Sequence, residues 1–176
     1  MFQIKRVLDG ELNLQITSNL RELLDVAFEG DFSEEDWLHT FGGFRFLGYL
    51  DGKLIAHGAV VLRNMKVDGR EIQVGYVEGV AVLPMHWRKG FGSLLMSEIT
   101  SYCSSEFQLS MLSTGDKHFY RKHGWLDFSG ESYVLKNGVE IRTLDEDEGL
   151  MFLVGVTGET SRITKAVCES RVGDHW

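Results

Sequence analysis

The pattern of apolar and polar residues predicts strands in a definite order. Period-two alternation predicts strands over about 2–7, 44–50, 53–62, 71–83 and 108–112, and around Trp125 and Tyr133. Two Asp-Gly pairs, at 51–52 and 68–69, suit type I′ hairpin turns, and Pro84 ends the long strand before it. An antiparallel meander is therefore expected in the first half of the chain.

Apolar residues at three- and four-residue spacing predict helices over Leu20 to Phe28, from Ser33 onward, over Phe91 to Cys103 and over Asp116 to His123. Thr17 or Ser18 would cap the first of these helices, and Gly30 would stop it. The C-terminal part is expected to add strands on either side of an acidic turn, Asp145 to Glu148, which we interpret as solvated surface.

Composition limits this picture further. The chain has 176 residues, 43% hydrophobic and 25% charged, which fits one globular domain over residues 1–176. No apolar run approaches the ~20 residues of a membrane span, so a cytoplasmic protein without membrane contact is expected. The net charge of -8 disfavours nucleic acid and favours cationic partners. With the order of elements, this predicts an α+β or mixed α/β domain.

The cysteines and histidines lack the spacing of metal ligands. Cys103 and Cys168 match no zinc or redox motif, and we interpret them as buried thiols. His118 and His123 are too far apart in sequence to share one helix face as ligands. We therefore expect no metal, and no chemistry from any of the six histidines.

The segment WRKGFGS, residues 87–93, is a candidate ligand-binding loop. Its two glycines let the backbone approach a ligand, and the helix that begins behind them leaves its first N–H groups unpaired. These donors and the helix dipole attract an anion such as a diphosphate. The spacing matches neither the dinucleotide fingerprint nor a Walker loop, and an ordinary turn is the alternative. The expected phosphate-binding residues are Arg88, Lys89, Gly90, Gly92 and Ser93.

The loop resembles the acyl-CoA pyrophosphate motif of the GNAT superfamily, (Q/R)-x-x-G-x-(G/A) after a strand, with Trp87 in place of the usual glutamine or arginine. Segments similar to the aminoglycoside 2′-N-acetyltransferases follow in that family's order: FEGDFSEEDWLHTFGG (28–43), VGYVEGVAV (74–82), FYRKHGW (119–125) and RVGDHW (171–176). The loop between Ser113 and Tyr120 is shorter than in that family, which leaves its substrate contacts open.

This resemblance implies the GNAT fold, a central, mostly antiparallel sheet with a splayed parallel strand pair and flanking helices. It also implies a homodimer that acetylates the 2′ amine of an aminoglycoside from acetyl-CoA, by direct attack in a ternary complex, and so confers antibiotic resistance. Val80 and Val82 would pair with the pantetheine arm as a peptide augments a sheet. The Val80 N–H would polarise the thioester carbonyl.

Two residues are expected to carry the proton transfers. Glu78, a carboxylate on an apolar strand, would accept the ammonium proton through water, and an ion pair with an arginine is the alternative. Tyr120 matches the GNAT acid position and would protonate the leaving thiolate, although a tyrosine on a short helix commonly only packs. Cys103 lies on an apolar helix face, so a covalent acetyl-cysteine is not expected.

Carboxylates are expected to surround the cationic substrate. The resemblance implies a substrate site of Asp31, Asp36, Glu78, Gly79, Ser113, Asp174 and the carboxylate at Trp176. Gly79 also suits a bulge that opens the strand. Asp31 and Asp36 have an alternative interpretation as loop and helix-start residues, and the GDHW tail as a frayed terminus.

Two other functions remain open at this point. One is a GNAT acetyltransferase for a polyamine or another small cationic metabolite, because an acidic pocket suits both acceptors. The other is a non-catalytic module that binds acyl-CoA or an aminoglycoside. Glu78 and Tyr120 argue against such a module, because pure binding needs neither residue.

Overall fold

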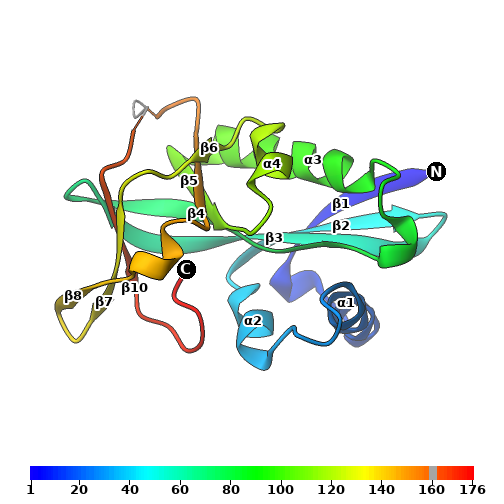
Figure 1. Ribbon diagram of the computed structural model, residues 1–176. Coiled ribbons are helices and arrows are strands. Elements are labelled where there is room, and N and C mark those ends of the chain that lie inside the picture. Colours follow the sequence, from blue (N-terminus) through cyan, green and yellow to red (C-terminus); the bar gives the residue numbers. More distant parts are fainter. Residues whose placement is uncertain (159–161) are drawn as a thin grey trace. The chain divides into compact units, whose positions relative to one another are not determined.

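The computed structural model describes residues 1–158 and 162–176, whose helices and strands are drawn in Figure 1. The chain divides into two compact units. Unit 1 comprises Met1–Val61 and Val77–Ile99, and unit 2 comprises Leu62–Tyr76 and Thr100–Trp176. The elements that contribute to both are β3 (Lys53–Val67), β4 (Arg70–Val82) and α3 (Phe91–Glu106). A single domain over residues 1–176 stays a prediction.

Unit 1 is built on an antiparallel ladder in which β2 (Gly43–Leu50) lies between β1 (Phe2–Leu8) and β3. The turn between β2 and β3 has a φ of 48° at Asp51 and 80° at Gly52. Both values are left-handed, as a type I′ turn requires, because its twist matches the twist of the flanking strands. The predicted hairpin is therefore confirmed.

Helix α1 (Leu14–Ala27) begins earlier than predicted, and the expected cap at Thr17 or Ser18 is wrong. Asn13 caps the helix instead, since its side chain accepts a hydrogen bond from the Ile16 N–H at 2.9 Å. The first turn escaped the apolar pattern because Leu14 is 91% exposed and does not extend the buried stripe. The short helix α2 (Glu34–His39) starts behind Ser33, as predicted.

Helices α1 and α2 lie on one face of the unit 1 ladder (Figure 1). Their shared apolar cluster comprises Leu20, Leu23, Leu24, Phe32, Trp37, Leu47 and Ala81. Helix α3 packs closely on β3 at Gly58, where an added Cβ would lie 2.5 Å from Ile99 Cδ1. A larger residue at this position would require the Ile99 side chain to move.

Unit 2 carries the strand order β6-β9-β5-β4-β3-β10-β7-β8. The additional strands are β5 (Leu109–Ser113), β6 (Leu126–Asp127), β7 (Glu131–Lys136), β8 (Val139–Arg142), β9 (Leu150–Val154) and β10 (Lys165–Glu169). β4 and β5 pair in parallel through Gly75↔Ser110 and Tyr76↔Met111, and β7 and β10 are also parallel. Antiparallel pairs join β5 to β9 and β7 to β8, so the sheet is mixed, as predicted.

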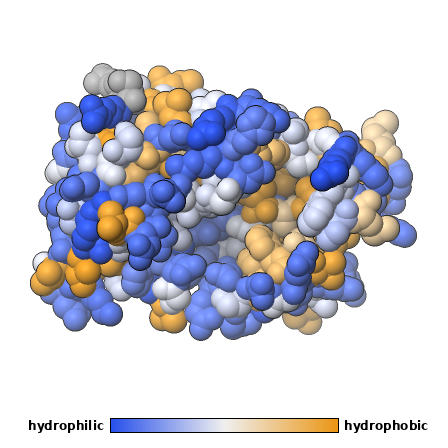
Figure 2. All heavy atoms as spheres, viewed as in Figure 1, coloured by the Kyte–Doolittle hydropathy of each residue, from blue (hydrophilic) through white to orange (hydrophobic). Residues whose placement is uncertain are grey.

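The short elements are η1 (Asp9–Glu11), η2 (Pro84–His86), α4 (Lys117–Arg121) and η3 (Leu144–Glu146). Cys103 and Cys168 are buried, free thiols, as predicted, and burial raises their pKa to about 12 and about 11. No helix in the described part of the chain combines the length and apolarity that a bilayer crossing requires. Figure 2 shows a face covered mostly by hydrophilic residues, with separate hydrophobic patches.

Candidate active site

The residues expected to handle the thioester lie in the unit 1 part of β4. Gly79 has a φ of 57°, a left-handed conformation within β4 that glycine adopts readily. A Cβ at Gly79 would lie 3.0 Å from Thr40 Cγ2 and 3.4 Å from His57 Cε1. Both the conformation and the crowding therefore require glycine, between the partly buried Glu78 and Val80.

The candidate phosphate loop follows η2, also in unit 1. Arg88 and Gly90 have left-handed φ values of 59° and 85°. The Leu94 N–H donates to the Gly90 carbonyl at 3.1 Å, so the N–H groups of residues 91–93 precede the first hydrogen bond of α3. A Cβ at Gly90 would meet nothing within 4 Å, so the loop surface is open. These features fit an anion held by backbone donors at a helix N-terminus.

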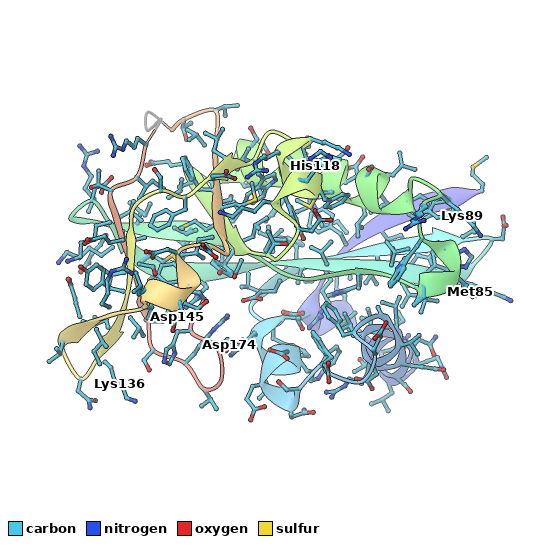
Figure 3. The ribbon with its side chains drawn as sticks, viewed as in Figure 1. Met85, Lys89, His118, Lys136, Asp145 and Asp174 are labelled. Atoms are coloured by element: carbon cyan, nitrogen blue, oxygen red, sulfur yellow. The ribbon has the colours of Figure 1, made fainter. Side chains whose placement is uncertain are left out.

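Trp87 occupies the motif position that departs from the superfamily pattern. Its Nε1–H donates to the Val82 carbonyl at 2.6 Å, which ties the loop back to the end of β4. Lys89 makes a similar bond from Nζ to the Met85 carbonyl at 2.9 Å. Figure 3 labels Lys89 in the loop before α3 and Met85 on η2. The Trp87 indole N–H is thus used within the protein to hold the loop against the end of β4. The glutamine or arginine usual at this position would instead have its polar group available to a ligand.

Tyr120 lies on α4 in unit 2 and is buried, with 9% of its surface exposed. Burial raises the pKa of Tyr120 to about 12. The charge of Asp116 contributes less in the same direction, and a hydrogen bond with Thr114 opposes the shift. The phenol is therefore protonated near neutral pH and is available as a donor. A phenol of this pKa is a weaker acid than a thiol, whose pKa is about 8.5.

The acidic turn after β8 is only partly the solvated surface that the sequence indicated. Asp145 and Glu148 are exposed, but the expectation is wrong for Asp147. The Asp147 carboxylate accepts hydrogen bonds from Arg142 and from the Ser132 N–H at 2.9 Å and hydroxyl at 2.6 Å. Burial alone would raise the pKa of Asp147, but these bonds outweigh it and lower the pKa.

Glu146, in the same turn, faces the C-terminal segment. Burial raises the pKa of Glu146, and the negative charge of Asp174 adds a smaller effect in the same direction. Figure 3 labels Asp145 on η3 and Asp174 on the C-terminal segment of the same unit. Asp145, Glu146 and Asp174 form an acidic cluster that the sequence interpretation did not recognise, because it treated the turn as plain surface.

The C-terminal segment is packed, which excludes the frayed terminus considered above. Trp176 is 4% exposed, and its Nε1–H donates to Thr143 Oγ1 at 3.0 Å. Arg171 donates to the Asp174 carbonyl at 2.6 Å and to the main-chain oxygen of Trp176 at 3.2 Å. The predicted substrate contact at that oxygen would therefore share it with Arg171.

The remaining predicted substrate residues differ in how far their side chains are already engaged in hydrogen bonds within the protein. Asp31 is exposed. Asp36 is part of the α2 capping box: its Oδ2 accepts from the Ser33 N–H, and its own N–H donates to Ser33 Oγ, both at 3.0 Å. One oxygen of Asp36 is thus committed to the helix start. Ser113 is exposed at the end of β5.

Each unit brings together one part of the predicted set. Unit 1 holds Asp31, Asp36, Glu78, Gly79, Val80, Val82, Arg88, Lys89, Gly90, Gly92 and Ser93, and unit 2 holds Ser113, Tyr120, Asp174 and Trp176. In unit 1, the Trp87 bond to the Val82 carbonyl joins the phosphate loop to the end of β4. The functional roles of these residues stay predictions.

Sequence reasoning missed His57, which it assigned no chemistry together with the other histidines. His57 is fully buried, and its Nδ1 lies 2.7 Å from the Gly79 carbonyl oxygen. The available indication was the one that drew attention to Glu78, a polar residue within an apolar strand, here IAHGAVV. The same pattern marks Arg45 within GFRFLGYL.

Comparisons with known proteins agree with this geometry. The chain matches the acetyltransferase (GNAT) family over residues 16–125. It is 36% identical over 173 residues to an aminoglycoside 2′-N-acetyltransferase of Mycolicibacterium fortuitum, covering 95% of this chain and 88% of that protein. The Escherichia coli GNAT acetyltransferase YhbS, solved with CoA, superposes with a TM-score of 0.69 at 15% identity and covers 97% of this chain and 89% of its own.

A Brucella melitensis GNAT acetyltransferase solved with acetyl-CoA gives a TM-score of 0.61 at 18% identity, with 93% of each chain covered. Two other matched structures are of longer chains, of which this chain spans about a third, 33% and 32%. The class of protein follows: it is an acetyltransferase with the predicted mixed α+β fold. The chain belongs to the GNAT family of acetyltransferases, whose match covers more than half of its residues.

Proposed function

We propose that the protein transfers the acetyl group of acetyl-CoA to the 2′ amine of an aminoglycoside. The observation that carries the proposal is the 36% identity, over 95% of the chain, to an aminoglycoside 2′-N-acetyltransferase. The net charge of -8 and the cluster of Asp145, Glu146 and Asp174 support it, because an aminoglycoside is a polycation and carboxylates accept strong hydrogen bonds from ammonium groups.

Acetyl-CoA would bind along β4 and at the loop before α3. The pyrophosphate would accept from the free N–H groups at the start of α3, with Arg88, Lys89 and Ser93 beside it. The pantetheine arm would pair with the backbone of Val80 and Val82 as an added strand. Because the Val82 carbonyl already accepts from Trp87, this pairing would rely on the remaining main-chain groups.

In the reaction, the 2′ amine nitrogen attacks the thioester carbon and the carbon–sulfur bond breaks. The Val80 N–H would stabilise the negative charge that develops on the carbonyl oxygen. Surrounding carboxylates raise the pKa of the substrate amine and hold it protonated, so a proton acceptor is needed before attack. Glu78, one residue before Gly79, would take that proton through water.

Tyr120 would act on the leaving sulfur. Because its pKa is about 12, the phenol would stabilise the thiolate mainly by donating a hydrogen bond, with transfer of the proton completing the release of CoA. Replacement of Tyr120 by Phe should therefore lower kcat more than the affinity for acetyl-CoA, by about tenfold or more. An unchanged kcat would remove Tyr120 from this role.

Substrate recognition would rest on the acidic residues and the backbone at Gly79. Asp31, Asp36 and Asp174, the main-chain oxygen of Trp176, the Gly79 backbone and Ser113 are the proposed contacts. Asp36 would use the oxygen that the α2 cap leaves free. Glu146, which shares the acidic cluster with Asp174, is an additional candidate.

Thiol release from acetyl-CoA tests the proposal directly. Purified protein is mixed with acetyl-CoA and one of three acceptors: an aminoglycoside with a 2′ amine, one with a 2′ hydroxyl, or a linear polyamine. We expect rapid thiol release with the 2′ amine alone. Equal rates with both aminoglycosides would overturn the 2′ assignment, a faster rate with the polyamine would replace the acceptor, and thiol release with none would indicate a binding module.

A further inference from the structure

A chain of polar groups in unit 1, mostly buried, ends on Gly79 of β4. Asp9 Oδ1 accepts from Arg45 Nε at 2.7 Å, Arg45 Nη1 lies 3.1 Å from His57 Nε2, and His57 Nδ1 lies 2.7 Å from the Gly79 carbonyl oxygen. Arg45 and His57 are both 0% exposed. Each link joins a different element, from η1 through β2 and β3 to β4.

The partners determine where the proton of His57 lies. A guanidinium can only donate, so His57 Nε2 accepts from Arg45. The proton of the neutral ring is then on Nδ1, which donates to the Gly79 carbonyl. Burial, and next the charge of Arg45, lower the pKa of His57 to about 3, so the ring is neutral at physiological pH.

The acceptor of this bond belongs to the peptide group that carries the Val80 N–H. The Gly79 carbonyl and the Val80 N–H share one planar trans peptide and point in opposite directions. Gly79, in a left-handed conformation with a φ of 57°, lacks the Cβ that would otherwise restrict this peptide. A bond that fixes the carbonyl therefore fixes the direction of the N–H and, by polarising the peptide, strengthens it as a donor.

We propose that His57 is a positioning residue for acetyl transfer, which holds the Gly79–Val80 peptide so that the Val80 N–H points at the thioester oxygen, and that Arg45 and Asp9 set its tautomer. The proposal rests on the proposed function, because that function assigns the thioester contact to Val80. The positioning by His57 would explain why the Val80 N–H points toward the thioester oxygen.

A purely structural role explains this chain of groups less well. Burying an ion pair is seldom favourable compared with apolar packing of the same volume. The pair also leaves Arg45 Nη2 without a hydrogen-bond partner among the described residues, although the guanidinium lies 4.3 Å from the Phe41 ring centroid and 5.0 Å from that of Trp37. Asp9 also accepts from the Gly42 and Gly43 N–H groups at 2.8 and 3.3 Å, which accounts for the carboxylate but not for the buried Arg45 and His57. Those two groups provide one oriented donor at Gly79.

Two substitutions of His57 separate the donor from the rest of the side chain. His57→Asn places an amide near the Nδ1 position and can keep the bond to Gly79. His57→Gln reaches toward the Nε2 position, so it can keep an acceptor for Arg45 and lose the bond to Gly79. Both variants bury a neutral amide, so their unfolding free energies should be similar, and urea denaturation checks this.

The readout is the affinity for acetyl-CoA relative to S-ethyl-CoA, which lacks only the carbonyl oxygen, measured by calorimetry without acceptor. The wild type should prefer acetyl-CoA by roughly two- to tenfold, the range of one net hydrogen bond. His57→Asn should keep this preference, and His57→Gln should lose it. In the transfer assay, His57→Gln should lower kcat by about 10- to 100-fold, below the effect of deleting an oxyanion donor. Its KM for acetyl-CoA should rise by no more than the roughly two- to tenfold preference that is lost.

The outcomes are distinguishable. If the wild type does not prefer acetyl-CoA, the Val80 contact of the proposed function is wrong, and this inference falls with it. If the wild type prefers acetyl-CoA and both variants behave alike, whether they keep the preference or lose it, the positioning role of His57 is overturned while the proposed function stands. A failure to acetylate aminoglycosides alone would leave the binding result intact.

Discussion

Two arginine–aspartate pairs of similar chemistry lie in very different surroundings. Arg45 of unit 1 is 0% exposed, and burial lowers its pKa despite the bond to Asp9. Arg142 of unit 2 is 28% exposed, and its bonds to Asp147 raise its pKa. The two carboxylates are alike, since the Asp9 and Asp147 side chains are 20% and 21% exposed, so the pairs differ in the arginine. Water reaches the Arg142 guanidinium, whereas Arg45 depends wholly on its protein partners. We therefore expect the loss of the carboxylate to cost more at Arg45 than at Arg142.

The largest expected effect is on the buried pair. Asp9→Ala leaves a buried, charged Arg45 without its carboxylate, which should reduce the free energy of unfolding by about 3–5 kcal/mol. Urea denaturation at neutral pH measures the change. A loss comparable to that of an exposed pair would show that Arg45 is not desolvated as the structure indicates.

The second prediction concerns pH and His57, which Arg45 and Asp9 face. The pKa of His57 is about 3 in the folded chain and 6.5 in the unfolded chain, so only the unfolded chain binds its proton in between. Stability is therefore full above pH 6.5 and falls as the pH drops toward 3. The wild type should lose up to about 1.4 kcal/mol per pH unit relative to His57→Asn. Parallel curves for the two proteins would contradict the low pKa.

A smaller effect is expected at the partly exposed pair of Arg142 and Asp147. Asp147→Asn removes the charge that accepts from Arg142 and Ser132, at a cost of about 1–2 kcal/mol at neutral pH. Because the folded pKa of Asp147 is lowered, this contribution is present above the ordinary carboxyl pKa and disappears as the pH falls through the folded value. Urea denaturation of both proteins at pH 7 and pH 3 should show the difference shrinking, and a constant difference would contradict the assignment.

The smallest effect is expected where the C-terminal segment joins the Asp147 network. Trp176→Phe keeps a buried ring but removes the bond from Nε1 to Thr143 Oγ1. The expected loss is about 0.5–1.5 kcal/mol, one net hydrogen bond. Thermal denaturation measures this loss of stability. Thr143→Val serves as the matched control, because it removes the acceptor of the same hydrogen bond. In the double variant this bond should therefore be lost only once, with no additional loss from it.

Local patterns predicted most of the fold, because they depend on residues that are near in sequence. The Asp-Gly turns, the Ser33 cap and the amphipathic α1 all have such patterns. β3 continues to Val67, whereas the prediction ended the strand at residue 62. The prediction stopped too early because Arg63, a charged residue, occupies an inward position where the pattern requires an apolar one. Arg63 is 3% exposed and stacks 4.8 Å from the Tyr76 ring centroid, an environment that no local pattern reveals.

Where a short motif carries the chemistry, as in the phosphate loop and at Glu78, the sequence alone is enough to propose site residues, and their roles stay predictions. It is not enough where separate segments meet. Asp9, Arg45 and His57 look like ordinary polar residues, and only the pairing of strands brings them together under Gly79. Glu146 was missed for the same reason, because its neighbour Asp174 is far along the chain.

The exposed indole of Trp87 also makes the phosphate loop optically accessible. Trp87 is 51% exposed, whereas Trp37, Trp125 and Trp176 are at most 8% exposed. A dissolved fluorescence quencher such as iodide should therefore reach one emitter far more readily than the other three. Ligand binding at the loop should shield that emitter, so the unmodified protein carries its own reporter of coenzyme occupancy.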